Sequence, residues 1–347
     1  MGRTSRLLER MITNMHHNET HGQFPLTRLR RLRQADWSRR LVAETKLGVN
    51  DLIWGIILKD GRGLREPIEA MPGIFRLSPD EAVKEAKRAH QLGIPALALF
   101  PYTGTKERSA DAKQALNPDN LMCKTASMIR DKVPEIGLMG DVALDPYTDH
   151  GQDGLMENGV ILNDQTTDIL IQQAIIQAKA GFQIVAPSDM MDGRIGAIRK
   201  ALEGENLIDT MIMAYAAKYA SKFYGPYREA IGSAGVLTGD KATYQMDPQN
   251  SAEAITEIAL DLSEGADMVM VKPGMPYLDI LTRARQTFDR PTFAFQVSGE
   301  YAMIMAAAAN GWLDGHGAMM EALAGFKRAG ADGIITYYAD IAAQSLA

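Results

Sequence analysis

The fold is decided by the pattern in residues 265–277, GADMVMVKPGMPY. A glycine that can end a helix comes first, then a short apolar run typical of a buried strand, and then a Pro-Gly break. Lys272 stands at the end of the run, directly after four neutral hydrophobic residues. An ammonium group held there is poorly solvated, so we expect a lowered pKa, as Schiff-base chemistry requires. The alternative is an ordinary lysine that extends from a strand end into solvent.

The same unit repeats along the chain from about residue 50 onward. Predicted strands are residues 52–58, 95–100, 136–144, 182–186, 210–215, 268–271, 292–297 and 333–337. Helical patterns between them include residues 78–91, 119–132, 164–180, 251–264 and 318–329. Such alternation indicates parallel strands with crossover helices, and eight units favour a closed (β/α)8 TIM barrel of the α/β class. No nucleotide-binding glycine motif follows the first strand, which argues against an open sheet.

The composition limits the class of protein. With 347 residues, 46% of them hydrophobic, the chain can form a large core. A net charge of -6 argues against nucleic acid as the main partner. A single cysteine, Cys123, excludes a disulfide framework and a thiolate zinc cluster. We find neither a long apolar run nor a signal pattern, so we expect no membrane partner and a cytoplasmic location.

The N-terminal region differs from the rest of the chain. Arginines are concentrated in residues 27–33 and recur at Arg39 and Arg40. A nucleic-acid or membrane patch is one interpretation, but the stretch is short and precedes an acidic region. We predict that residues 1–48 form an arm that contacts another subunit, and that residues 49–347 form the catalytic barrel.

Polar residues gather where the predicted strands end, which is where barrel enzymes carry their chemistry. They are Asp141 in the third strand, Ser188 and Asp189 after the fourth, Lys218 just beyond the fifth, Lys272 at the end of the sixth, and Ser298 and Tyr337 at the seventh and eighth. Lys218 and Lys272 are then expected on neighbouring strand ends, roughly 5 Å apart. Two ammonium groups repel, so each lowers the pKa of the other. The pair predicts carbonyl chemistry, with two carbonyl substrates or one amine acting as a proton relay.

Two other functions stay open on these residues alone. A single-Schiff-base aldolase would need a phosphate site after the last two strands, of which Ser298 and Gly299 give a hint. A barrel that binds a metabolite without turnover would not need both lysines. Since both are present, an enzyme is favoured.

Several segments resemble the delta-aminolevulinic acid dehydratase (porphobilinogen synthase) family. Besides residues 265–277 they are DVALDPY (141–147), PSDMMDGR (187–194), KYASKFYGPYR (218–228), QVSGEY (296–301) and KRAGAD (327–332). The resemblance runs from about residue 24 to the end of the chain. It implies condensation of two 5-aminolevulinate molecules into porphobilinogen with loss of two waters. That lyase reaction is an early step of tetrapyrrole (heme and chlorophyll) biosynthesis and uses no organic cofactor.

By similarity, each site residue receives a role. Lys272 would form the Schiff base with the substrate that becomes the propionate side, and Lys218 the one for the acetate side. The first substrate carboxylate would be held by Arg228 and Lys241 with Gln245, and the second by Ser298 and Tyr337. Asp141 would contact the substrate amino group or relay protons, and Ser188 would bind substrate.

The resemblance also raises the question of metals. Zinc-dependent relatives carry three cysteines where this chain has Ala143, Asp145 and Asp153, so zinc has lost its soft ligands. The two carboxylates could hold Mg²⁺, water or the substrate ammonium group. Glu257 matches the family's allosteric magnesium ligand at a subunit interface. The family tends to form octamers of arm-exchanging dimers, which predicts a homo-octamer.

Two further features are expected to tune the reaction. Phe295 stands where many relatives carry a tyrosine, so one hydroxyl is missing from the pocket. Residues 148–156 are rich in Gly and Asp and are predicted to form a mobile lid that excludes water during imine chemistry.

Overall fold

The computed structural model describes residues 22–233 and 235–347, and the chain divides into two units, Met1–Lys46 and Leu47–Ala347. The first unit holds a 3-10 helix, η1 (Leu29–Arg33), and the helix α2 (Asp36–Leu41). Asp36 lies in the first turn of α2 and Arg40 in its last, where each complements the helix dipole, and the two side chains pair at 2.8 Å. That residues 1–48 contact another subunit stays a prediction, and residues 1–21 lie outside the described part.

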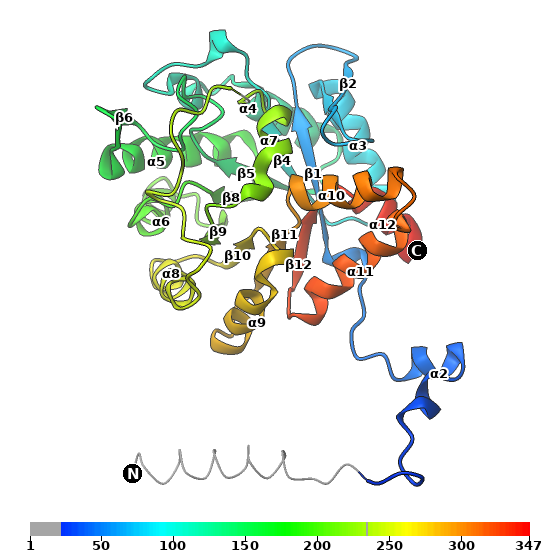
Figure 1. Ribbon diagram of the computed structural model, residues 1–347. Helices are drawn as coiled ribbons and strands as arrows, with labels where there is room; N and C mark the ends of the chain where they lie inside the picture. Colours follow the sequence, from blue (N-terminus) through cyan, green and yellow to red (C-terminus); the bar gives the residue numbers. More distant parts are fainter. Residues whose placement is uncertain (1–21, 234) are drawn as a thin grey trace, which may run out of the picture. The chain divides into compact units, whose positions relative to one another are not determined.

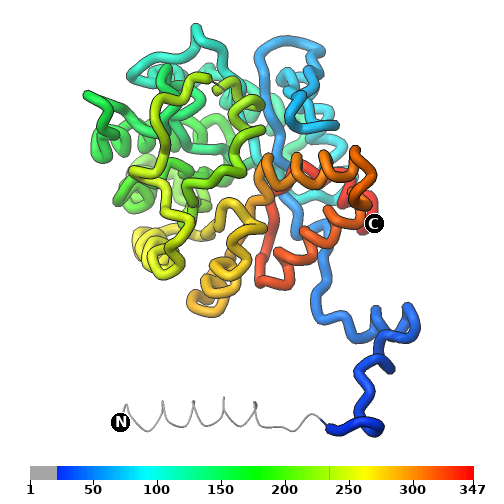
Figure 2. The backbone as a smooth tube through the Cα atoms, viewed as in Figure 1, coloured from blue at the N-terminus to red at the C-terminus, as the bar shows by residue number. Residues whose placement is uncertain are grey.

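The second unit is a barrel of eight parallel strands (Figure 1). The strands are β1 (Leu52–Leu58), β4 (Ala96–Pro101), β5 (Gly137–Val142), β8 (Ile184–Pro187), β9 (Met211–Lys218), β10 (Met268–Lys272), β11 (Thr292–Phe295) and β12 (Gly333–Thr336). They pair in chain order, and the barrel closes where β12 pairs with β1, with Leu52 opposite Ile334. Figure 2 shows these two strands, blue and red, side by side. The predicted (β/α)8 barrel is therefore confirmed, with all eight strands.

Helices surround the strands (Figure 1). They are α3 (Pro79–Gln91), α4 (Leu121–Lys132), α5 (Asn163–Ala180), α6 (Arg194–Gly204), α7 (Gly225–Ala230), α8 (Ala252–Ser263), α9 (Leu278–Thr287), α10 (Ser298–Ala309), α11 (Gly315–Arg328) and α12 (Ala339–Leu346). Helix α11 begins three residues before its predicted start, because the Asp314 side chain accepts a hydrogen bond from Gly317 N and caps it. Gly181 ends α5 at a φ of 108°, a left-handed conformation that favours glycine.

Short elements fill the loops. They are η2 (Val49–Asp51), β2 (Arg65–Pro67), β3 (Phe75–Leu77), η3 (Thr105–Glu107), η4 (Lys113–Leu116), β6 (Met156–Glu157), β7 (Val160–Ile161), η5 (Lys222–Tyr224) and η6 (Met275–Tyr277). No helix within residues 22–233 and 235–347 is long and apolar enough to cross a membrane.

The barrel strands are buried along almost their whole length, and every residue of β1 is buried. Burial on both faces explains why these strands read as continuous apolar runs and not as alternating ones. A buried ion-pair cluster lies within this packing. Arg194 is 2% exposed, and its Nη1 lies 3.1 Å from Asp261 Oδ1 and its Nε 3.5 Å from Asp189 Oδ2. It joins α6, α8 and the loop after β8.

We predict that Gly140→Ala destabilises the barrel. A Cβ at Gly140 would lie 2.4 Å from Gln177 Oε1 and 3.0 Å from Phe182 Cδ1, so β5 or α5 must shift. Overpacking of this kind lowers the free energy of unfolding by about 1–3 kcal/mol. Urea denaturation followed by circular dichroism measures it. Gly204→Ala is the control, since nothing lies within 4 Å of the added atom. Equal stability of the two variants would contradict the packing argument.

Candidate active site

Two lysines end neighbouring strands at the carboxyl end of the barrel. Lys218 is the last residue of β9 and Lys272 the last of β10, and they are direct partners in the parallel ladder. Both are buried, with 5% and 6% of their surfaces exposed. Their adjacency is confirmed, but the predicted end of the fifth strand at residue 215 is wrong. The ladder continues through Ala217 opposite Val271, so Lys218 lies within the strand and not beyond it.

A bulge in β9 places Lys218 directly opposite Lys272 in the parallel ladder. Val269 pairs with Ala214, whereas Val271 pairs with Ala217, so β9 contains one extra residue between these positions. A bulge re-aims the side chains that follow it. Tyr215 and Lys218 are an odd number of residues apart, yet Tyr215 contacts Lys272 and Lys218 lines a cavity with Lys272. The extra residue therefore lets both side chains serve the same site.

Lys272 lies among aromatic rings. Its Nζ is 4.8 Å from the ring centre of Phe295, 4.9 Å from that of Tyr215, and 5.4 Å from those of Tyr224 and Tyr227. Burial, and then the nearby Lys218 ammonium, lower the pKa of Lys272 to about 7. The direction is the one expected from the sequence for this lysine. Near neutral pH a substantial fraction of its amine is unprotonated and able to attack a carbonyl carbon.

Lys218 has a different environment. Its Nζ donates a hydrogen bond to the backbone oxygen of Ser188 and lies 3.4 Å from Asp153 Oδ1. Within residues 22–233 and 235–347, Lys218 forms an ion pair and Lys272 forms none. The two amines are therefore chemically distinct although they share one cavity.

Asp145 and Asp153 are paired with lysines. Lys241 Nζ lies 3.1 Å from Asp145 Oδ2 and 2.7 Å from Asp153 Oδ2. Burial alone would raise the pKa of Asp153, but the ammonium groups of Lys218 and Lys241 outweigh it and bring the pKa to about 2. In the described part of the chain, no group of three or more His, Cys, Asp or Glu side chains is arranged to hold a metal ion.

Three buried polar atoms in or directly after barrel strands have no hydrogen-bond partner among the described residues. They are Asp141 Oδ1, Tyr215 Oη and Tyr337 Oη. Leaving such an atom unpaired costs about 1–3 kcal/mol. Burial raises the pKa of Asp141 to about 6, and the Lys272 ammonium opposes that rise. A polar ligand could supply the hydrogen bonds that these three atoms lack. The sequence had not indicated Tyr215, because an apolar strand with one tyrosine reads as core.

The residues predicted to bind the first carboxylate come together. Arg228, Lys241 and Gln245 line one small cavity of about 30 Å³ with Lys218 and Lys272. A cleft of about 380 Å³ adjoins it and shares Arg228, Lys241 and Gln245. The inner space is small compared with the adjoining cleft.

The remaining predicted binders lie outside that cavity. The Ser298 hydroxyl oxygen accepts a hydrogen bond from Tyr227 N at 2.9 Å, which leaves its own hydrogen free to donate. Tyr337 is 1% exposed, and its ring centre lies 5.9 Å from that of Phe295. Ser188 contributes its backbone oxygen to Lys218. Phe295, where a tyrosine was expected in relatives, stacks on Phe100 at 5.8 Å.

The predicted lid is folded against a second loop. Residues Thr148, His150, Gln152 and Asp153 are buried. Gln152 Nε2 donates to the backbone oxygens of Thr238 and Asp240 at 2.7 and 2.9 Å, and Thr238 N donates to His150 O at 3.0 Å. These two loops close the site, while mobility of the lid stays a prediction.

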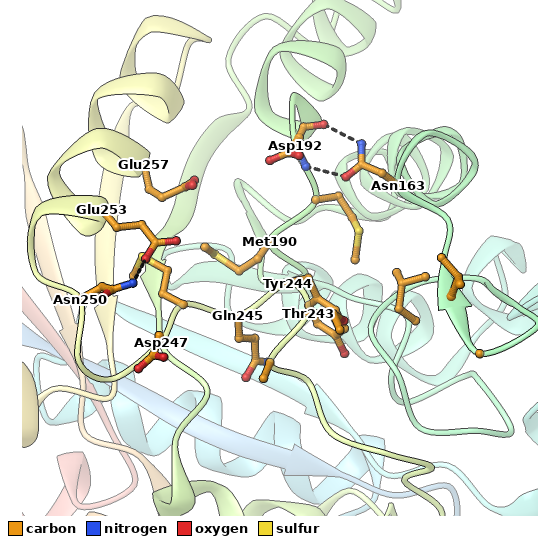
Figure 3. Close-up of a pocket in the computed structure, with 16 residues that line it drawn as sticks. Asn163, Met190, Asp192, Thr243, Tyr244, Gln245, Asp247, Asn250, Glu253 and Glu257 are labelled. Atoms are coloured by element: carbon orange, nitrogen blue, oxygen red, sulfur yellow. Dashed lines mark hydrogen bonds between the residues drawn. The ribbon is translucent and has the colours of Figure 1, made fainter.

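Glu257 lines a separate cleft of about 580 Å³ (Figure 3). The close-up shows Glu257 and Glu253 on one side of the cleft, with Asp192 and Asn163 across from them. Asp247 lines the same cleft. Burial, and then the Asp261 carboxylate, raise the pKa of Glu257. The cleft is therefore acidic and partly desolvated.

The fold and the site define a class: a (β/α)8 barrel enzyme with two buried lysines at the carboxyl ends of adjacent strands. The family model described as Delta-aminolevulinic acid dehydratase matches residues 26–345. The chain belongs to the delta-aminolevulinic acid dehydratase family.

Individual members of this family are similar to the chain over most of its length. The delta-aminolevulinic acid dehydratase of Bradyrhizobium diazoefficiens is 60% identical over 92% of this chain and 90% of its own length. That of Rhodobacter capsulatus is 49% identical over 92% of this chain and 97% of its own. A crystal structure of the Toxoplasma gondii enzyme in complex with the reaction product porphobilinogen is similar at a TM-score of 0.90. It shares 46% identity and covers 92% of this chain and 91% of that one.

We predict that Lys272 is acetylated by acetic anhydride with a midpoint near pH 7, because only the neutral amine reacts. Mass spectrometry of the peptides follows the modification. Asp141→Asn should lower the midpoint, since the carboxylate favours the ammonium form, and Lys218→Met should raise it by removing a repulsive charge. A midpoint at the unperturbed value of about 10.4 would contradict the buried environment.

Proposed function

We propose that this enzyme works through Schiff bases on Lys272 and Lys218. As a member of its family it condenses two 5-aminolevulinate molecules into porphobilinogen with loss of two waters, a lyase reaction of tetrapyrrole biosynthesis. The observation that carries the proposal is the direct pairing of Lys218 with Lys272, which line one cavity together. Two amines can each activate one carbonyl substrate, as a condensation of two keto acids requires.

Lys272 is the amine prepared to react first. Its neutral form attacks the substrate carbonyl carbon, the oxygen leaves as water, and a C=N bond links lysine to substrate. The surrounding rings of Tyr215, Phe295 and Tyr224 exclude water, which would hydrolyse that bond. Asp141, with a pKa of about 6, can exchange protons near neutral pH and can pair with the substrate amino group.

The substrate carboxylates have two sets of partners. Arg228 can bind one carboxylate with two parallel hydrogen bonds, and Lys241 adds a point charge beside Lys218. Gln245 supplies a further polar contact. For the other carboxylate, the Ser298 hydroxyl hydrogen and Tyr337 Oη, which has no hydrogen-bond partner among the described residues, are both available as donors. Ser188 and Asp153 hold Lys218 in place.

The active site's donor set does not fit a tightly bound divalent metal. Asp145 and Asp153 are neutralised by Lys241 and Lys218, and Ala143 offers no ligand. Cys123 is buried on α4, where burial raises the pKa of its thiol to about 11 and disfavours the thiolate that zinc requires. We therefore propose that the two aspartates position the lysines, and that this chain belongs to a branch without the zinc cysteines.

The cleft around Glu257 suits Mg²⁺ better. Magnesium keeps several waters and is held by one or two carboxylates, and Glu257 faces a cleft that also contains Glu253, Asp192 and Asp247. We propose Glu257 as the ligand of a regulatory Mg²⁺.

The first unit has a surface that favours association with other subunits. Large apolar side chains are exposed there, namely Phe24, Leu26, Leu29, Leu32, Trp37 and Leu41. Exposed apolar groups of this density favour burial on a partner. Together with the family resemblance they support a homo-oligomer, for which we propose the octamer, in the cytoplasm.

Reduction by borohydride in the presence of 5-aminolevulinate is expected to attach substrate to Lys272 and to Lys218, located by peptide mass spectrometry. Lys272→Met and Lys218→Met should each lower kcat by about a thousandfold or more, since members of a catalytic unit fail together. Lys179→Met is the control, because Lys179 is exposed on α5 and pairs with Glu205. If neither lysine is trapped in the wild type, the proposed mechanism is wrong.

Glu257→Gln is expected to weaken Mg²⁺ binding roughly tenfold or more. Isothermal titration calorimetry with Mg²⁺ measures the affinity directly, independent of activity. Glu203→Gln, at an exposed carboxylate on α6, is the matched control. Unchanged affinity in the Glu257 variant would place the metal elsewhere.

A further inference from the structure

Three consecutive residues at the start of α10 contact the loops that follow both lysines. Ser298 Oγ accepts a hydrogen bond from Tyr227 N, and a Cβ on Gly299 would lie 2.3 Å from Phe223 O. The Glu300 side chain accepts from Met275 N at 2.5 Å. The first two contacts fall on the segment after Lys218, and the third falls three residues after Lys272. The start of α10 therefore joins the backbones that leave the two strand ends.

Glu300 is the buried charge in this group. It is 0% exposed, and each carboxylate oxygen accepts one backbone N–H: Oε1 from Met275 and Oε2 from Val297, both at 2.5 Å. Within the described residues, no Lys, Arg or His side chain lies within ion-pair distance of Glu300. Its charge is stabilised by backbone dipoles and by the amino end of α10.

Helix capping alone does not account for this residue. The bond from Val297 N is the one that a Glu or Gln at the third helical position makes in a capping box, so it is an ordinary feature of a helix start. The second oxygen instead reaches a loop 25 residues away in the chain. Burial raises the pKa of Glu300 to about 7 although the backbone N–H groups oppose it. A buried carboxylate is thus retained at a position where it costs stability.

The Met275 loop is held tightly around Lys272. A Cβ on Gly274 would lie 2.3 Å from Phe326 Cε1, so the loop packs closely against α11. On the other side, Lys272 O accepts hydrogen bonds from Tyr219 N at 3.0 Å and from Tyr224 Oη at 3.3 Å. The strand ladders hold the backbone up to Lys272, and these hydrogen bonds hold it from the Lys272 carbonyl to Met275, while the Lys272 amine lies among the aromatic rings.

We propose that Glu300 is a positioning residue for Lys272. Its carboxylate fixes Met275, and through it the depth at which the Lys272 amine is buried among the rings of Tyr215 and Phe295. The inference rests on the proposed function, in which that amine forms the imine. It assigns no contact between Glu300 and substrate.

The test is Glu300→Gln in the full-length enzyme. A glutamine can accept only one of the two hydrogen bonds, and its NH₂ group would face a backbone N–H. The loop should loosen and Lys272 become better solvated, so the acetylation midpoint of Lys272 should rise by at least about half a pH unit. Borohydride trapping of 5-aminolevulinate at Lys272 should slow about tenfold, because the amine is less often neutral and well placed. KM should change less than kcat.

Asp314→Ala is the matched control. Asp314 caps α11 by accepting from Gly317 N, and in the described part of the chain it makes no hydrogen bond to the segments that follow Lys218 and Lys272. Its loss should lower the unfolding temperature without moving the Lys272 midpoint. If Glu300→Gln only lowers the unfolding temperature in the same way, its role is structural and the proposal is overturned.

The outcomes separate the two claims. A wild type trapped at Lys272, with an unchanged midpoint and trapping rate in Glu300→Gln, overturns the positioning role and leaves the proposed function intact. A wild type trapped at neither lysine overturns both, and one trapped at Lys218 alone overturns the positioning role. Should the variant fail to fold, amide exchange in the wild type decides: Met275 N–H is expected to be protected, and exchange at the rate of a free loop amide overturns the proposal.

Discussion

The active site depends on one constraint, the pairing of the ends of β9 and β10. Closure of the barrel forces the eight strand ends into a ring, and the bulge in β9 brings Lys218 level with Lys272. The consequence is electrostatic. Two amines of like charge share a closed space, so protonating both is unfavourable and the one without a partner gives up its proton. The lowered pKa of Lys272 therefore depends on the register between β9 and β10, which places Lys218 opposite Lys272.

The side chains around Lys272 and Lys218 give the two amines different properties. Four aromatic rings surround the Lys272 amine, exclude water from it and leave a substantial fraction of it neutral near pH 7. Lys218 is held by Ser188 O and Asp153, and Asp153 is shared with Lys241. This chain of alternating charges fixes Lys218 and the predicted carboxylate binder Lys241 relative to each other. It also supports the proposal that Asp145 and Asp153 position lysines.

The sequence predicted much of this arrangement, because the strands are buried on both faces and appear as apolar runs closed by glycines. All eight strands, and Lys272 at the end of one of them, could be found in that way. The end of β9 could not, since a bulge leaves no mark in hydrophobic periodicity. Tyr215 and Glu300 were not predicted either. Their importance comes from partners distant in the chain, and a tyrosine in a strand or a glutamate in a first turn is ordinary by itself.

A buried lysine whose pKa is lowered, as that of Lys272 is, destabilises the folded protein. Lowering its pKa from 10.5 to about 7 corresponds to roughly 4–5 kcal/mol of lost stability at pH 7 and below. The unfolded chain binds the proton more tightly, so this cost declines as pH rises from about 7 and is gone above the unfolded pKa. A large barrel core can bear it, but a loosely held loop would relax and let water reach the amine. Hydrogen bonds from Tyr224 Oη to Lys272 O and from Met275 N to Glu300 hold the backbone at Lys272 and in the loop that follows, and so oppose that relaxation. The rigidity of the loop is thus the physical condition for the reactivity of the lysine.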